Sequence, residues 1–141
     1  MGEQKVQVFS NTSQKASFIQ HLLWDIEALE WMLQNQCFEK GITRIGAEQE
    51  FCLVTKDWRP ANNADAILKR VQDPHFTTEL AKYNLEINLD PVVLKGDCFH
   101  RVEQQLKMLL EKAKIAAKEE KSRVLLTGIL PTISQNHLKL D

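Results

Sequence analysis

The sequence predicts a mixed fold, of the α+β or α/β class, in which long helices cover one face of a sheet. Two long segments carry apolar residues at steps of three and four, which is typical of amphipathic helices. Two shorter segments alternate apolar and polar residues, which is typical of strands with one buried face. The periodicity leaves open which strands pair and in which direction.

The first long helix is expected over residues 13–36. Its apolar stripe consists of Phe18, Leu22, Ile26, Leu29 and Leu33. Ser13 or Ser17 could cap its start, and Gly41 could end the segment. Trp24 and Trp31 lie off this stripe, so they form either a second packing face or a surface for a partner.

Residues 43–55 are expected to form a strand, and residues 63–71 a short helix. The apolar side of the strand is Ile45, Ala47, Phe51 and Leu53, and its polar side is Gly46, Glu48 and Glu50. Turn residues separate the strand from the helix, and an Asp-Pro pair follows the helix.

A second strand is expected over residues 83–89, a long helix over 98–120, and a short buried strand over 123–130. The apolar side of the 83–89 strand is Tyr83, Leu85, Ile87 and Leu89, and its polar side is Asn84, Glu86 and Asn88. Asp97 is a plausible N-cap for the second long helix, and lysines in its last turn suit the helix dipole.

Composition and charge exclude several classes of protein. The chain has 141 residues, with 18 lysines and arginines against 19 aspartates and glutamates, so one soluble domain is expected. A net charge of −1 argues against a broad basic surface for nucleic acid. No apolar stretch approaches the ~18–20 residues of a membrane span. The first fifteen residues are too polar for a signal peptide, and the three cysteines contain no C-x-x-C pair, so we expect a cytoplasmic protein.

Four glutamates are the candidate functional residues. Glu48 and Glu50 lie two apart on one expected strand, and Glu86 lies on the polar face of the other. Glu79 precedes Glu86 by seven positions. If the two strands are neighbours, these carboxylates converge, and their repulsion requires cations or shifted pKa values. Hard divalent cations are the natural partner, whereas the alternative is an amphipathic sheet whose glutamates face water.

Three motifs resemble those of glutamate–cysteine ligases and related carboxylate–amine ligases. Residues 44–54, RIGAEQEFCLV, resemble the G-x-E-x-E first strand of that family. Residues 76–91 contain an acidic residue followed seven positions later by a glutamate and then by a proline, similar to the family's next acidic element. Residues 127–132, TGILPT, are similar to a later strand and proline turn. The resemblance covers about residues 42–133.

The resemblance implies a glutamine synthetase-like sheet of the α+β class, an antiparallel bowl backed by helices. In such a bowl, glutamates hold Mg²⁺ ions that bind ATP. It implies Glu48, Glu50, Glu79 and Glu86 as metal ligands, the first two and Glu86 also serving the nucleotide. The implied reaction is ATP-dependent amide formation, as in glutathione biosynthesis: glutamate's carboxylate becomes an acyl phosphate, and an amine such as that of cysteine displaces phosphate. The sequence does not specify the acceptor amine.

We therefore expect two parts in the chain. Residues 1–41 form a helical segment, and residues 42–141 form an incomplete N-terminal part of a catalytic domain. The arginines are scattered and there is no glycine-rich phosphate loop, so the isolated chain is expected to lack ligase activity.

Two other classes stay open: a non-catalytic interaction or dimerisation module that uses the Trp24/Trp31 helix, and a small divalent-cation-binding domain. A homo-oligomer could form through the 13–36 helix or through an uncovered sheet.

Overall fold

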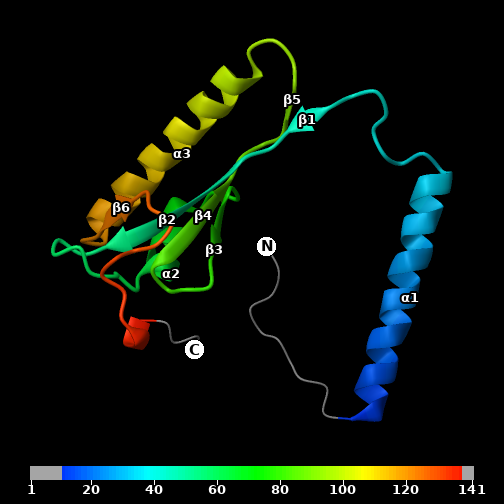
Figure 1. The fold of residues 1–141 in the computed structure, drawn as a ribbon, viewed down its shortest axis with the longest axis horizontal. Helices are drawn as coiled ribbons and strands as arrows, with labels where there is room; N and C mark the ends of the chain where they lie inside the picture. Colours follow the sequence, from blue (N-terminus) through cyan, green and yellow to red (C-terminus); the bar gives the residue numbers. More distant parts are fainter. Residues whose placement is uncertain (1–10, 138–141) are drawn as a thin grey trace. The chain divides into compact units, whose positions relative to one another are not determined.

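The computed structural model describes residues 11–137. Residues 1–10, on which much of the signal-peptide interpretation rests, and residues 138–141 lie outside the described part. The chain divides into two compact units, Met1–Ile42 and Thr43–Asp141. The described residues form an α+β protein with three α-helices and two small antiparallel sheets, which confirms the broad fold class (Figure 1).

The first unit contains one helix, α1, over Thr12–Gln34. The expected caps Ser13 and Ser17 lie inside it, because Asn11 is the N-cap and its side chain accepts a 2.9 Å hydrogen bond from the backbone of Gln14. None of the residues of α1 is buried. No helix in residues 11–137 is both long and apolar enough to cross a bilayer.

The end of α1 is set by Gln36 rather than by Gly41. Gln36 adopts a left-handed conformation with φ of 57°. The backbone N–H of Cys37 donates to the carbonyl of Met32 at 2.9 Å, and that of Gln36 donates to the carbonyl of Leu33 at 3.3 Å. This pair of bonds is a Schellman motif, which satisfies carbonyls that the helix end would otherwise leave unpaired.

The second unit is built on a four-stranded antiparallel sheet in the order β3-β4-β2-β6. Its strands are β2 (Glu48–Val54), β3 (Phe76–Thr78), β4 (Asn84–Asn88) and β6 (Arg123–Leu125). The smaller sheet pairs β1 (Arg44–Ile45) with β5 (Val92–Val93).

The strand predictions are correct in position but wrong in extent, and the last strand is not buried as expected, because Arg123 is exposed and Val124 and Leu125 are half-buried. The expected 43–55 strand is two strands, β1 and β2, separated by Gly46 and Ala47. The expected 123–130 strand ends at Leu125, because the chain turns where the Thr127 hydroxyl donates to the Ile129 carbonyl at 3.0 Å. Short strands β3 and β5 were not expected.

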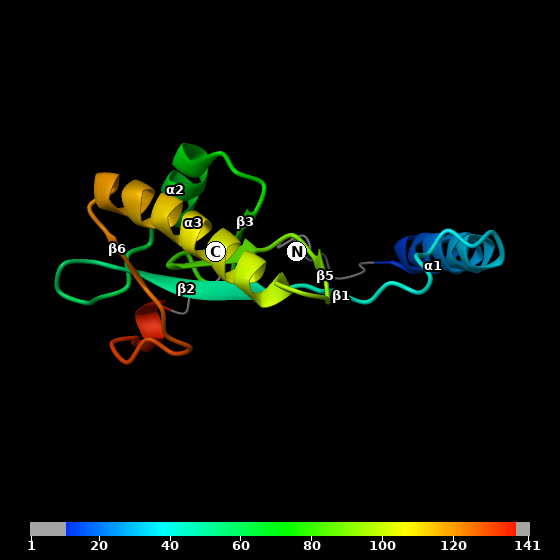
Figure 2. The same ribbon diagram turned by 90° about the horizontal axis from the view of Figure 1, so that it is seen from above.

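Helices α2 (Ala64–Val71) and α3 (Cys98–Glu119) pack on one face of the larger sheet (Figure 2). Asp97 is the N-cap of α3, as expected, but its side chain makes no capping bond. Phe51, Leu53, Leu85 and Ile87 come from the strands, and Leu109 comes from α3. Each is at most 1% exposed, so the alternation in β2 and β4 correctly predicts which face is the core.

The opposite face of the sheet is acidic at one end and apolar at the other. Cys52, Val54, Tyr83 and Leu130 form a second buried cluster there. Tyr83 therefore does not share the face of Leu85, contrary to the expected alternation. It lies outside β4, where strand alternation no longer applies, although its backbone carbonyl still accepts a 2.6 Å hydrogen bond from the N–H of Leu53. Burial of Cys52 raises the pKa of its thiol.

Candidate acidic metal site

The strand register gathers acidic residues on the face away from α2 and α3. Glu50 on β2 lies directly opposite Glu86 on β4, and Thr77 on β3 lies opposite Glu86 on its other side. Because directly opposed residues share a face, the side chains of Glu50, Glu86 and Thr77 form a row across β2, β4 and β3. Glu79 immediately follows β3 and reaches the same face. Two sequence-distant motifs thus meet because β4 pairs with both β2 and β3.

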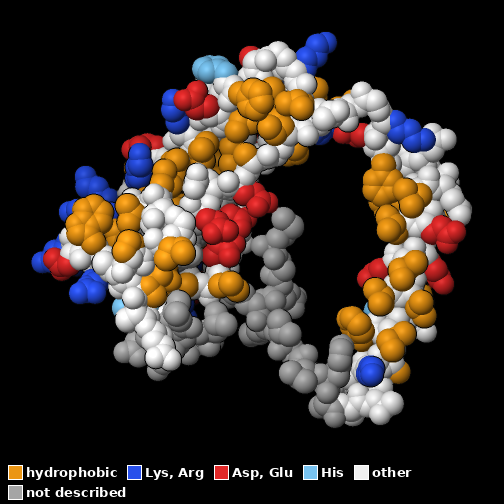
Figure 3. Space-filling view, viewed as in Figure 1, with side chains coloured by type: hydrophobic (Ala, Val, Ile, Leu, Met, Phe, Trp, Pro, Cys, Tyr) orange, Lys and Arg blue, Asp and Glu red, His pale blue; other side chains and the backbone are white. Residues whose placement is uncertain are grey.

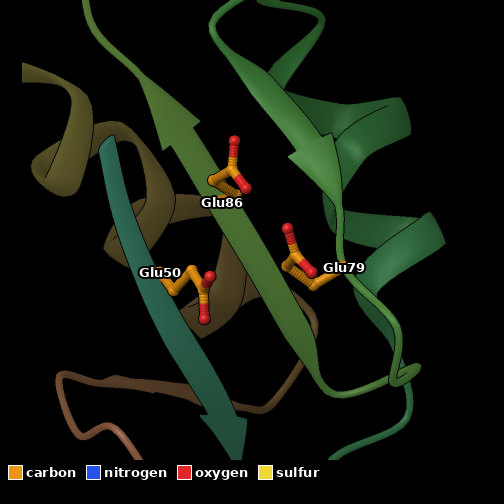
Figure 4. A group of neighbouring side chains, drawn as sticks. All are labelled: Glu50, Glu79 and Glu86. Carbon is orange, nitrogen blue, oxygen red and sulfur yellow. The ribbon is translucent and has the colours of Figure 1, made fainter. Parts of the chain in front are cut away.

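The carboxyl groups of Glu50, Glu79 and Glu86 lie close together. One carboxylate oxygen from each residue lies within 4.8 Å of the others, and the three side chains occupy one side of the sheet (Figure 4). Glu86 is buried, with 7% exposure, Glu79 is half-buried and Glu50 is exposed. Acidic side chains gather on the corresponding part of the surface in Figure 3.

The electrostatics of this acidic group, defined as Glu50, Glu79 and Glu86, differ between its members. A hydrogen bond with Glu86 raises the pKa of the Glu79 carboxyl, and burial and the nearby negative charges raise it further. The pKa of Glu86 is lowered because its carboxylate accepts hydrogen bonds from Glu79 and from Asn88. Of these two neighbouring carboxyls, Glu79 is therefore the one that keeps its proton to higher pH, as expected for closely placed like charges.

The donor chemistry of the acidic group fits a divalent cation. Three carboxylates offer only oxygen ligands, which Mg²⁺ and Mn²⁺ prefer. With bonds of ~2.1 Å, the ligands of a six-coordinate Mg²⁺ lie about 3.0 Å apart when adjacent and about 4.2 Å apart when opposite, so side-chain movements of roughly 1–2 Å would bring all three oxygens into range. A bound cation would compete with protonation of Glu79, whose pKa is raised.

Glu48 lies on the same face but outside the acidic group. It pairs with Asn88, one repeat along β2 from Glu50, and its side chain is exposed. Residues 48 and 50 are thus separated by ~6.6 Å along the strand. Sequence analysis did not single out Thr77 as a neighbour of the site. Its position opposite Glu86 depends on the β3–β4 pairing, and β3 is too short for alternation to reveal it.

Comparison with known proteins finds no relative of this chain. No family model, no curated protein and no solved structure matches the chain. The interpretation of the acidic group rests on its geometry, its electrostatics and the order of the motifs that supply it.

Proposed function

We propose that this chain forms the metal-holding wall of an ATP- and Mg²⁺-dependent carboxylate–amine ligase with a glutamine synthetase-like sheet. The observation that carries the proposal is the meeting of Glu50 with Glu79 and Glu86. These glutamates belong to two separate motifs that resemble the acidic elements of glutamate–cysteine ligases. An antiparallel sheet with one helix-covered face and one acidic face is consistent with that kind of wall.

Each carboxylate has a role in this proposal. Buried Glu86 and half-buried Glu79 would hold one cation firmly, because little water competes for their oxygens. Exposed Glu50 would complete the ligand set on the open side, where ATP's phosphates approach. The bound Mg²⁺ would supply charge neutralisation between those phosphates and the incoming carboxylate. Glu48, farther along β2, would serve the nucleotide or a second ion.

The proposed reaction class is that of the ligases whose motifs this sequence resembles. The substrate's carboxylate oxygen attacks the terminal phosphorus of ATP, the bond to ADP breaks, and an acyl phosphate results. The amine nitrogen then attacks the acyl carbon, phosphate leaves, and the nitrogen loses a proton. In this proposal the chain supplies the cation site. The groups that bind the phosphates are supplied by other residues of the enzyme, so the chain by itself should not turn over ATP.

The test is a calorimetric titration of the full chain with Mn²⁺, followed by ATP. We expect one Mn²⁺ site, weakened at least tenfold by Glu86→Gln and by Glu50→Gln. Glu103→Gln is the matched control, because Glu103 is 56% exposed on α3 and pairs with Lys107 at 2.7 Å. Binding should release a proton at low pH and none at high pH, since Glu79 loses its proton as pH rises through its raised pKa.

The ATP arm separates the ligase from a plain cation-binding domain. If the chain is part of the ligase, ATP should bind only when Mn²⁺ is present. The Glu86→Gln variant should lose this metal-dependent binding of ATP. Mn²⁺ binding without metal-dependent ATP binding would favour the cation-binding domain, which the same three carboxylates also support. Absence of Mn²⁺ binding at millimolar metal would contradict both.

A further inference from the structure

Helix α1 exposes nearly all of its large apolar side chains. Their exposed fractions range from 37% for Met32 to 61% for Leu33. The set comprises Phe18, Ile19, Leu22, Leu23, Trp24, Ile26, Leu29, Trp31, Met32 and Leu33. Hydrophobic side chains follow the length of α1 in Figure 3. Contiguous apolar surface on this scale marks a contact site, whereas isolated exposed apolar residues do not.

Local interactions define where α1 begins and ends. Asn11 caps the first turn and the Schellman motif at Gln36 closes the last. Between them, the rings of His21 and Trp24 meet edge to face with their centroids 5.0 Å apart, and the Gln34 side chain donates to Glu30 at 3.2 Å. In proteins most helical stability comes from packing of an apolar face, so we expect the 23-residue α1 to draw much of its stability from packing of its apolar surface.

A heptad seam runs along α1. Ile19, Leu22, Ile26, Leu29 and Leu33 follow one another at alternating steps of three and four. With Ile19 as position a, isoleucine occupies the first two a positions and leucine both d positions, a combination that favours two-stranded coiled coils. Phe18, Leu23 and Met32 flank the seam at g and e positions. Trp24 and Trp31 occupy f positions, on the side of the helix facing away from it.

The seam has the area that a dimer requires. The five seam residues and three flanking residues, each about half exposed, present roughly 600–800 Å² per helix, against ~800 Å² per partner in a standard interface. The helix carries few charges within this surface: Asp25 and Glu30 flank it, and Lys15 precedes it. A seam of this pattern is complementary to itself, which is the condition for an isologous two-fold contact.

We propose that α1 pairs with α1 of a second copy of this chain through the seam of Ile19, Leu22, Ile26, Leu29 and Leu33. Knobs-into-holes packing of the two seams buries the five seam side chains and covers the flanking Phe18, Leu23 and Met32. Trp24 and Trp31 stay outside this contact. The inference is independent of the proposed ligase function, because it uses no residue of the acidic group.

Sedimentation equilibrium of the full chain tests the proposal. The wild-type chain should be a reversible dimer at micromolar concentration. Leu29→Ala should raise the dissociation constant of the dimer at least tenfold, because each dimer loses two seam leucines. Alanine has the highest helix propensity, so this variant separates loss of the contact from loss of the helix, and circular dichroism at high concentration checks this.

Trp31→Ala is the matched control. It removes a larger apolar side chain two residues away, on the opposite side of α1, and should leave the dimer intact. A monomeric wild-type chain overturns the proposal, whether α1 then packs on its own chain or binds lipid vesicles. Equal weakening by Trp31→Ala and Leu29→Ala also overturns it, because the contact would then not be the seam.

Discussion

His75 joins three segments of the second unit through two aspartates. Its Nδ1 lies 2.6 Å from Oδ1 of Asp73, and its Nε2 lies 3.1 Å from Oδ2 of Asp90. Lys112 of α3 donates to Asp73 at 2.6 Å, and Gln105 of α3 donates to Asp90 at 2.8 Å. Both imidazole nitrogens therefore have carboxylate neighbours. Because α3 donates hydrogen bonds to the same two aspartates, these five residues connect α3 to the sheet, and we call them the His75 clasp.

The charges of this clasp shift two pKa values in opposite directions. The hydrogen bond from Lys112 lowers the pKa of Asp73 from 3.8 to about 2. Hydrogen bonds to Asp73 and Asp90 raise the pKa of His75 above its ordinary 6.5. The Asp73 contribution is present above pH 3.8 and is lost as pH falls through about 2. The His75 contribution is present below pH 6.5 and is lost as pH rises through its raised pKa.

Replacement of His75 should remove part of the pH dependence of stability. In the wild-type chain, the His75 contribution makes the free energy of unfolding larger at about pH 5.5 than at about pH 8.5, because protonated His75 binds both aspartates. His75→Gln should diminish this difference, as measured by urea unfolding at the two pH values. His100→Gln is the control, since His100 is 62% exposed on α3. An unchanged difference in His75→Gln would show that the clasp does not titrate with folding.

The acidic group shows how far single residues could be assigned in advance. Strand alternation placed Glu50 and Glu86 on polar faces, and pairing of β2 with β4 brings them together. Glu79 was found through its motif, since it follows β3 and no alternation covers it. Glu48 has the same sequence signal as Glu50 but lies outside the group, because β4 places Glu86 opposite Glu50.

At the scale of elements, helix ends depend on backbone conformations that composition does not reveal. The C-cap of α2 is Gln72, which has a left-handed conformation with φ of 45°. Lys121, which lies just after α3, is also left-handed, with φ of 58°. Glycine is the usual residue at such positions. The glycine expected to end the first helix, Gly41, is left-handed too, but it lies five residues beyond the turn made by Gln36.

Gln72→Gly should stabilise the second unit. A left-handed conformation costs an L-residue about 1–2 kcal/mol, and glycine avoids this cost but loses more chain entropy on folding. The expected net gain is about 0.5–1 kcal/mol in the free energy of unfolding, measured by urea denaturation. Gln72→Ala provides the comparison, because alanine keeps the strain and should show no gain. A loss on Gln72→Gly would mean that the Gln72 side chain contributes more than the strain costs.

At the scale of the whole molecule, the larger of two buried clusters, between the sheet and helices α2 and α3, supports the second unit. Leu109 of α3 is fully buried among residues of the strands and α2. Leu109→Ala should lower the free energy of unfolding by about 2–5 kcal/mol, a large part of the ~5–15 kcal/mol typical of a domain. Met108→Ala, at a neighbouring residue that is 53% exposed, should change it by less than about 1 kcal/mol. Similar effects of the two variants would contradict the assignment of α3's buried side.

The sequence by itself determined the helices, the central strands, the core face of β2 and β4, and the polar positions of the candidate glutamates. These follow from periodicity, because a helix or strand repeats its exposure every 3.6 or two residues. The tertiary structure decided which glutamates meet and that Tyr83 joins a second cluster. Those outcomes depend on the pairing of β4 with β2 and β3, a contact between distant segments that local periodicity does not encode.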